Sequence, residues 1–129
     1  MAVPGALTPT EVVTAWRAGA DFIKVFPCGP VGGDEYIKAL HASLPQIPLI
    51  AAGGVNQQTA ASFILSGATA IGVGTELIPN EAIQRKQSQR IHELARRFAK
   101  LVRDAREQLE AWKRSQVVKE FTGTQKCEK

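Results

Sequence analysis

A single lysine interrupts a strongly apolar segment. Lys24 lies in the middle of the stretch FIKVF, which is typical of a buried β-strand. Side chains alternate between the faces of a strand, so Phe22, Lys24 and Phe26 share one face, and Ile23 and Val25 share the other. If Ile23 and Val25 face covering helices, Lys24 points into the interior of the fold, where its ammonium loses hydration and the neutral amine becomes accessible. A neutral amine attacks carbonyl carbons, as in enzymes that form a Schiff base.

A structural role explains the same lysine equally well. A buried carboxylate can pair with its ammonium, or its aliphatic stem can lie along the strand while the ammonium reaches solvent. The spacing of residues around Lys24 does not separate these possibilities from a catalytic role. Lys24 is therefore both a candidate nucleophile and a candidate structural residue.

Glycines mark the ends of two later apolar stretches. Gly53 and Gly54 follow the stretch PLIAA, and Gly72 and Gly74 lie in the stretch GVGT, which Thr75 closes. Glycine lets backbone N–H groups approach an anion closely, and a helix N-terminus adds a favourable potential. Each pair taken alone is typical of an ordinary turn. Two such strand ends downstream of an inward lysine favour a phosphorylated or otherwise anionic substrate.

Helical and extended patterns alternate along the chain. Thr8, Pro9 and Glu11 predict a capped helix start, and Gly19 predicts the end of that helix. Apolar strands that alternate with helices indicate an α/β fold with a parallel sheet, in which the strand ends carry the functional loops. The other expected segments are a strand over 21–27, a helix opened by Gly32 and Gly33 and continued from Tyr36 to Leu44, a strand over 48–52, a helix over 55–68 capped by Asn56, a strand over 69–77, and an amphipathic helix through 91–109.

Composition narrows the class of protein. The 129 residues are enough for one domain with a core, and 44% of them are hydrophobic. There is no run of about eighteen apolar residues that would predict a membrane span, and the N-terminal stretch lacks the pattern of a secretory signal. Cys28 and Cys127 have no metal-ligand spacing, so we expect free thiols in a reducing cytoplasm and no metal site.

The net charge of +4 is unevenly distributed. Residues 80–129 hold 13 Lys and Arg against 7 Asp and Glu, whereas residues 1–79 hold 3 against 5. A basic half can indicate nucleic-acid binding. Here the basic residues alternate with acidic and apolar ones, and few aromatic residues are interleaved for base stacking. We therefore expect the solvated face of a long helix, with no nucleic-acid or membrane partner.

Four stretches together resemble a known enzyme family. VPGALTPTEV, DFIKVFPC, AAGGVN and IGVGTEL occur in the order and spacing of the 2-keto-3-deoxy-6-phosphogluconate aldolase / 4-hydroxy-2-oxoglutarate aldolase family, and FIKVFP is the most specific part. The resemblance covers residues 3 to about 106. It implies a TIM (β/α)8 barrel, usually trimeric, that acts as a class I aldolase. Such an enzyme reversibly cleaves a 2-keto-4-hydroxy acid into pyruvate and an aldehyde through a lysine Schiff base, without metal or cofactor.

The resemblance also implies roles for particular residues. Lys24 corresponds to the lysine that forms the Schiff base with the keto carbon of the substrate. Pro27 follows at the strand end and shapes the pocket. The remaining positions approach or donate to the distal phosphate of the substrate, and they are Gly53, Gly54, Gly74 and Thr75, where threonine replaces a serine as the hydroxyl donor.

Two departures from the family pattern matter. The family often has threonine before its double glycine, where this sequence has Ala52, so the aldehyde partner stays open. In the family about four further βα units precede the part that matches, and they carry a glutamate acid/base and an arginine for the keto-acid carboxylate. Glu11 and Glu76 do not occupy the matching motif, so neither receives a catalytic role.

The expected architecture is therefore part of a barrel. Residues 1–114 would form the C-terminal half of a TIM barrel with a long C-terminal helix, and residues 115–129 a polar, disordered tail. Three full strands cannot close a barrel of eight, so the face that carries Lys24 would lie open. We expect the chain alone to be a poor aldolase or inactive. Its expected partners are the keto-acid substrate and either further copies of the chain, as in the family trimer, or the missing half-barrel.

Two other functions fit the same residues. A phosphate-binding barrel fragment would keep the glycines but give Lys24 no covalent role. A non-catalytic fragment would bind a partner through its basic C-terminal helix.

Overall fold

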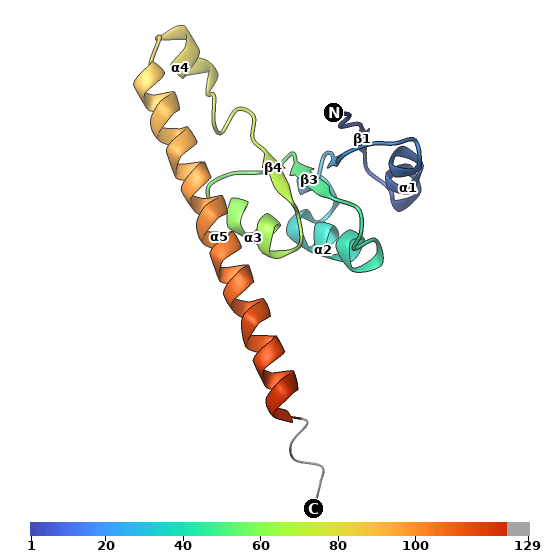
Figure 1. The fold of residues 1–129 in the computed structure, drawn as a ribbon. Helices are drawn as coiled ribbons and strands as arrows, with labels where there is room; N and C mark the ends of the chain where they lie inside the picture. The colour runs from blue at the N-terminus through green and yellow to red at the C-terminus, as the bar shows by residue number, and fades with distance from the viewer. Residues whose placement is uncertain (124–129) are drawn as a thin grey trace, which may run out of the picture.

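The computed structural model describes residues 1–123, with side chains described up to residue 119. Figure 1 shows these residues as a small α/β unit flanked by one long helix. The elements are β1 (Gly5–Ala6), α1 (Pro9–Arg17), β2 (Ile23–Val25), the 3-10 turn η1 (Gly29–Val31), α2 (Gly33–Ser43), β3 (Leu49–Ala52), α3 (Ala60–Leu65), β4 (Ala70–Gly72), α4 (Asn80–Gln84) and α5 (Ser88–Gly123).

The strands form one parallel sheet in the order β1-β2-β3-β4. Gly5 lies opposite Lys24, Lys24 opposite Ile50, and Ile50 opposite Ala70. Residues that lie directly opposite each other in a parallel sheet point to the same face, so these four positions define one face. The parallel sheet and its helical connections confirm the predicted α/β fold class.

The buried core lies between the other face of the sheet and the helices. Ile23 and Val25 of β2 and Leu49 and Ala51 of β3 are fully buried there. Figure 1 shows α2 and α3 on this same side of the sheet. The alternation of buried and exposed residues along β2 is the one predicted from FIKVF, because Lys24 between Ile23 and Val25 is exposed.

The start of α1 is held by a capping box. The Oγ1 atom of Thr8 accepts a hydrogen bond from the N–H of Glu11 (3.3 Å), and the carboxylate of Glu11 accepts one from the N–H of Thr8 (2.8 Å). Pro9 occupies the first helical turn, and Gly19 follows the end of the helix with φ +94°. The predicted start and end of this helix are therefore confirmed.

Two strands are shorter than predicted. The strand predicted over 21–27 is regular only from Ile23 to Val25, and Pro27 has no N–H to extend the hydrogen-bonded ladder. The strand predicted over 69–77 ends at Gly72, because the chain then turns and the N–H of Leu77 donates to the carbonyl oxygen of Gly74 (3.0 Å). The short elements β1 and α4 were not predicted from the apolar pattern.

The long helix α5 packs mainly on α3. Phe98 and Ala105 on its inner side are buried, and the guanidinium of Arg106 donates to the carbonyl oxygen of Thr69 at the start of β4 (2.7 Å). The helix continues to Gly123, so the tail predicted from residue 115 is helical over 115–123 and the prediction of disorder there is wrong. The rest of that tail, including Cys127, lies outside the described residues.

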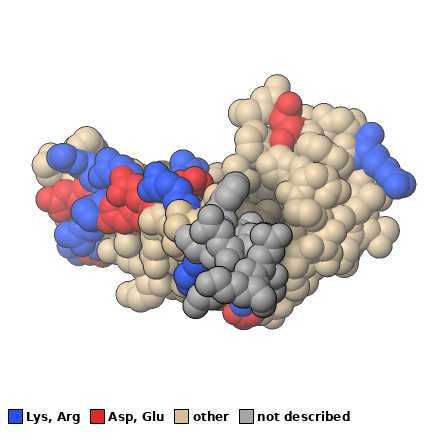
Figure 2. All heavy atoms as spheres, turned by 60° about the horizontal axis from the view of Figure 1, so that its bottom comes forward, with Lys and Arg blue, Asp and Glu red and all other residues tan. Residues whose placement is uncertain are grey.

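Charged side chains gather on α5. Figure 2 shows blue and red atoms interspersed over this helix, while the face of the sheet unit in the same view is mostly uncharged. Ion pairs such as Lys100 with Asp104 and Lys113 with Glu110 connect adjacent turns. This mixture agrees with the predicted solvated helix face. Among residues 1–123, no helix is both long and apolar enough to cross a membrane.

Candidate active site

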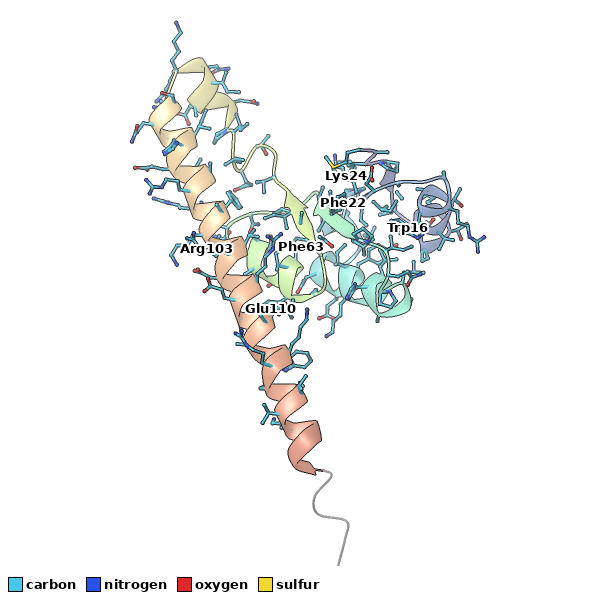
Figure 3. The ribbon with its side chains drawn as sticks, in the orientation of Figure 1. Trp16, Phe22, Lys24, Phe63, Arg103 and Glu110 are labelled. Atoms are coloured by element: carbon cyan, nitrogen blue, oxygen red, sulfur yellow. The ribbon has the colours of Figure 1, made fainter. Side chains whose placement is uncertain are left out.

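Lys24 projects from the uncovered face of the sheet. Figure 3 shows its side chain on the side of β2 that points away from α2. Its Nζ atom lies 5.1 Å from the centre of the Phe26 ring, a cation–π distance, and Phe26 is itself 53% exposed. The face is open, as expected for part of a barrel. The side chain of Lys24 is therefore exposed to solvent in this chain.

The loops that follow β2 and β3 are joined by backbone hydrogen bonds. The N–H of Cys28 donates to the carbonyl oxygen of Ala52 (2.8 Å), and the N–H of Gly29 donates to that of Gly53 (2.9 Å). A Cβ atom on Gly53 would lie 3.0 Å from Pro27, and one on Gly54 would lie 2.8 Å from the Cα of Gly29. Both glycines also have φ near +80°. Close packing of the two loops therefore explains Gly53 and Gly54 without any ligand.

Gly74 has no such packing explanation. A Cβ atom built on Gly74 would meet no atom within 4 Å, and its backbone does not adopt the left-handed conformation that favours glycine. By contrast, a Cβ atom on Gly72 would lie 3.1 Å from the Cβ of Ala52. Nothing in the described chain requires a glycine at position 74, which leaves close approach of a ligand as a physical reason for it.

A hollow of about 570 Å³ brings most of the predicted site residues together. Lys24 lines it from β2, while the glycines come from the loops after β3 and β4. Pro27 lies against Gly53 but does not line the hollow. The lining residues are Lys24, Phe26, Ala52, Gly53, Gly54, Val55, Asn56, Gly72, Val73, Gly74, Thr75 and Glu76.

Sequence reasoning missed the polar side chains of Asn56 and Glu76 in this hollow. Asn56 was predicted only as a helix cap, and that prediction is wrong, because α3 begins at Ala60 after Thr59 and has no side-chain cap. The Oδ1 atom of Asn56 instead accepts hydrogen bonds from the N–H groups of Gln58 and Thr59 in the turn before the helix (2.9 Å each). The hydroxyl of Thr59 in turn donates to the carbonyl oxygen of Gly54 (3.0 Å). Glu76 directly follows Thr75 in the segment after β4, and this position next to a predicted site residue was the available signal.

Cys28 and Glu11 have structural roles. Cys28 is fully buried, its Sγ–H donates to the carbonyl oxygen of Val25 (3.1 Å), and burial raises the pKa of its thiol. Glu11 serves the cap of α1 and lies outside the hollow. Among the described residues, no group of three or more His, Cys, Asp or Glu is placed to hold a metal ion.

Comparison with known proteins decides the family. The model of KDPG and KHG aldolases matches residues 1–94. The chain belongs to the KDPG and KHG aldolase family. This confirms the resemblance drawn from the four sequence stretches, and it places the parallel sheet among the strands of a TIM-like barrel.

Individual aldolases support the same assignment. The chain is 38% identical over 104 residues to 2-dehydro-3-deoxy-6-phosphogalactonate aldolase of Escherichia coli (strain K12), an alignment that covers 79% of this chain and 48% of that protein. The solved native KDPGal structure is 36% identical, with a TM-score of 0.70, and the match covers 81% of this chain and 49% of that one. The chain thus spans about half the length of the aldolases that it matches.

A designed protein matches more of the chain. It is a cube-shaped, porous cage made by fusing symmetric oligomeric domains, with 33% identity and a TM-score of 0.79. The match covers 95% of this chain and 44% of the cage chain. Coverage this extensive must include most of α5, the element that continues beyond the family match at residue 94.

Proposed function

We propose that this chain carries the Schiff-base part of a class I aldolase site. The observation that supports the proposal best is the hollow that brings Lys24 together with Gly74 and Thr75 on the uncovered face of the sheet. Lys24 would attack the keto carbon of a 2-keto-4-hydroxy acid. The N–H groups and the hydroxyl after β4 would bind the distal anionic group.

The chain supplies the amine for this chemistry, and an acid/base group must also take the proton of the substrate's C4 hydroxyl. The neutral amine of Lys24 adds to the keto carbon, water leaves, and a protonated imine remains. This imine accepts the electron pair of the C3–C4 bond when the bond breaks. The C4 hydroxyl gives its proton to water or to an acid/base group, the aldehyde leaves, and an enamine remains. Protonation of the enamine and hydrolysis of the imine then release pyruvate and restore the lysine.

The proposed substrate is a compound of the 2-keto-3-deoxy-6-phosphogluconate type, with glyceraldehyde 3-phosphate or glyoxylate as the aldehyde product. The relatives share about half their length with this chain, so the whole reaction is part of the proposal. Because the side chain of Lys24 is exposed and the chain matches only about half of its relatives, we expect little or no turnover by the chain alone.

Borohydride trapping tests the proposal. The protein is incubated with pyruvate and borohydride, and the peptide that contains Lys24 is examined by mass spectrometry. We expect a reduced pyruvyl adduct on that peptide, no adduct in Lys24→Ala, and an unchanged adduct in the control Lys38→Ala, which removes an exposed lysine paired only with Glu35. Absence of the adduct in a sample shown to be folded would contradict the proposal.

A second candidate function keeps the anion site without covalent chemistry. The cation–π contact between Lys24 and Phe26 gives the lysine a structural role, and the open position of Gly74 would still accept a phosphate. This function predicts phosphate binding that survives Lys24→Ala and no trapped adduct. Isothermal titration with inorganic phosphate, alongside the trapping experiment, separates the two.

A further inference from the structure

The side-chain amide of Asn56 is held in one orientation by the turn before α3. Its oxygen faces the N–H groups of Gln58 and Thr59, at 2.9 Å from each nitrogen. A backbone N–H can only donate, so the amide atom that faces both of these groups must be the oxygen Oδ1. The nitrogen Nδ2 therefore lies at the other end of the amide, away from the two N–H groups.

The Nδ2 atom of Asn56 has no acceptor in the protein. Over residues 1–119, whose side chains the structure describes, the hydrogen bonds of this residue go only through its Oδ1 atom and its backbone N–H. Asn56 is half-buried and lines the hollow of about 570 Å³. A half-buried amide with unused N–H groups gains free energy when a ligand oxygen accepts from it. The wall of the hollow therefore offers two unused donors.

The lining of this hollow has almost balanced charges. Of the residues that line it, Lys24 carries a positive charge, Glu76 carries a negative one, and the others are uncharged. Net charge therefore gives little attraction for an anion. Recognition of an anionic group then depends on hydrogen-bond donors that point at its oxygens.

We propose that Asn56 is a substrate-binding residue, whose Nδ2 atom donates to an oxygen of the distal phosphate together with the hydroxyl of Thr75. Ala52 lies opposite Gly72 in the sheet, so the loops that carry Asn56 and Thr75 leave neighbouring parallel strands at the same edge. The open space at Gly74 gives the phosphate room. The inference rests on the proposed function, and it adds a donor from the loop after β3 to those after β4.

Thr59 positions this donor before any ligand arrives. Its hydroxyl accepts a hydrogen bond from the N–H of Asn56 (3.0 Å) and donates one to the carbonyl oxygen of Gly54 (3.0 Å). The turn over residues 54–59 is thereby closed by its own hydrogen bonds. A donor that is already fixed loses little conformational entropy when it binds, so Asn56 is suited to recognise one position of the phosphate.

Asn56→Asp separates a binding role from a structural one. The carboxylate keeps an oxygen for the N–H groups of Gln58 and Thr59, but it replaces the Nδ2 donors with an acceptor that carries a negative charge. Urea unfolding should therefore change little, whereas isothermal titration should show inorganic phosphate bound at least about tenfold more weakly. Equal phosphate affinities in the wild type and Asn56→Asp, or no phosphate binding by the wild type, would overturn the proposal.

Asn80→Asp is the matched control for the added charge. Asn80 is exposed at the start of α4 and does not line the hollow. This variant should bind phosphate as the wild type does. A similar loss of affinity in both variants would contradict a specific role of Asn56, because it would follow from net charge alone.

Nuclear magnetic resonance tests the donor itself. The pair of side-chain amide signals that disappears in Asn56→Asp identifies the Nδ2 protons of Asn56. In the wild type these two signals should shift as inorganic phosphate is added, with the same midpoint as the calorimetric titration. Signals that stay in place at saturating phosphate would overturn the proposal, even if Asn56→Asp binds more weakly.

Borohydride trapping keeps this inference apart from the proposed function. Wild-type protein that binds phosphate through Asn56 but forms no pyruvyl adduct on Lys24 would contradict the aldolase chemistry and leave the role of Asn56 supported. An adduct on Lys24 together with Asn56 signals that do not respond to phosphate would give the opposite result.

Discussion

The Cβ atom of Ala52 lies close against the backbone of Gly72, so a side chain at position 72 would crowd it. A Cβ atom on Gly72 would lie 3.1 Å from that of Ala52, and Ala52 is only 3% exposed. The sequence resemblance to the aldolase family implies threonine where this chain has Ala52. Alanine is smaller than threonine, and its small side chain allows the close contact between β3 and β4, the two strands that border the hollow.

Two neighbouring glycines should respond differently to the same substitution. Gly72→Ala should lower the free energy of unfolding by about 1 kcal/mol, because the added methyl group crowds Ala52. Gly74→Ala should leave stability nearly unchanged but weaken the binding of inorganic phosphate, because its methyl group enters open space in the hollow. Urea unfolding and isothermal titration measure the two effects. Equal stability losses in both variants would contradict this distinction.

The contact between Gly54 and Gly29 should be costly to disturb. Gly54→Ala combines a φ of +81° with a Cβ atom only 2.8 Å from the Cα of Gly29, so we expect a loss of about 2–3 kcal/mol or more. Gly19→Ala is the control, since it has φ +94° but nothing within 4 Å. It should lose only about 1 kcal/mol, from backbone strain alone. Denaturant unfolding of both variants gives the comparison, and a smaller loss in Gly54→Ala than in Gly19→Ala would be the contrary result.

The cap of α1 should make stability depend on acid pH. The backbone N–H of Thr8, followed by that of Leu7, holds the pKa of Glu11 below its ordinary value of 4.5. The stabilisation is therefore complete above pH 4.5 and is lost as the pH falls through the lower pKa of the folded state. Thermal unfolding across this range should show a steeper acid loss for the wild type than for Glu11→Gln. Parallel curves would exclude this contribution.

The thiol of Cys28 should react slowly in the native protein. It is fully buried and its pKa is raised by that burial, so little thiolate is present and reagent access is poor. In a Cys127→Ser background, alkylation by iodoacetamide at mildly alkaline pH should be at least about tenfold slower than in the denatured chain. Mass spectrometry follows the reaction over time. Similar rates in both states would show that the loop after β2 opens freely.

The cap of α1 and the alternation along β2 were predictable because they depend on residues close together in the sequence. Thr8 and Glu11 lie within one turn, and Ile23 and Val25 are spaced by the repeat of a strand. The hydrogen bonds from Cys28 and Gly29 to the next loop were not predictable, because they join backbone atoms whose positions depend on the packed sheet. The extension of α5 beyond residue 115 was missed for another reason. Its continuation is polar, and an apolar repeat carries no information about a solvated helix.

The site shows the same limit. Lys24 could be placed on its face from strand spacing, but its hydration depends on what covers the sheet. Gly53 and Gly74 look alike in the sequence, and only the structure shows that one is required by loop packing and the other is not. Glu76 lines the hollow because of the path that the chain takes after β4, and no local sequence pattern specifies that path.

The hydrogen bonds from Cys28 to Ala52 and from Gly29 to Gly53 extend the sheet beyond its strands and into the rim of the hollow. The loops after β2 and β3 are therefore coupled, because neither loop can change its position without breaking hydrogen bonds to the other. Amide protons of Cys28 and Gly29 should accordingly exchange with solvent more slowly than those of Thr75 and Glu76, which lie exposed after β4. Under the proposed function, adaptation to aldehydes of different length would depend on the β4 side of the rim, because the loops next to Lys24 are held together.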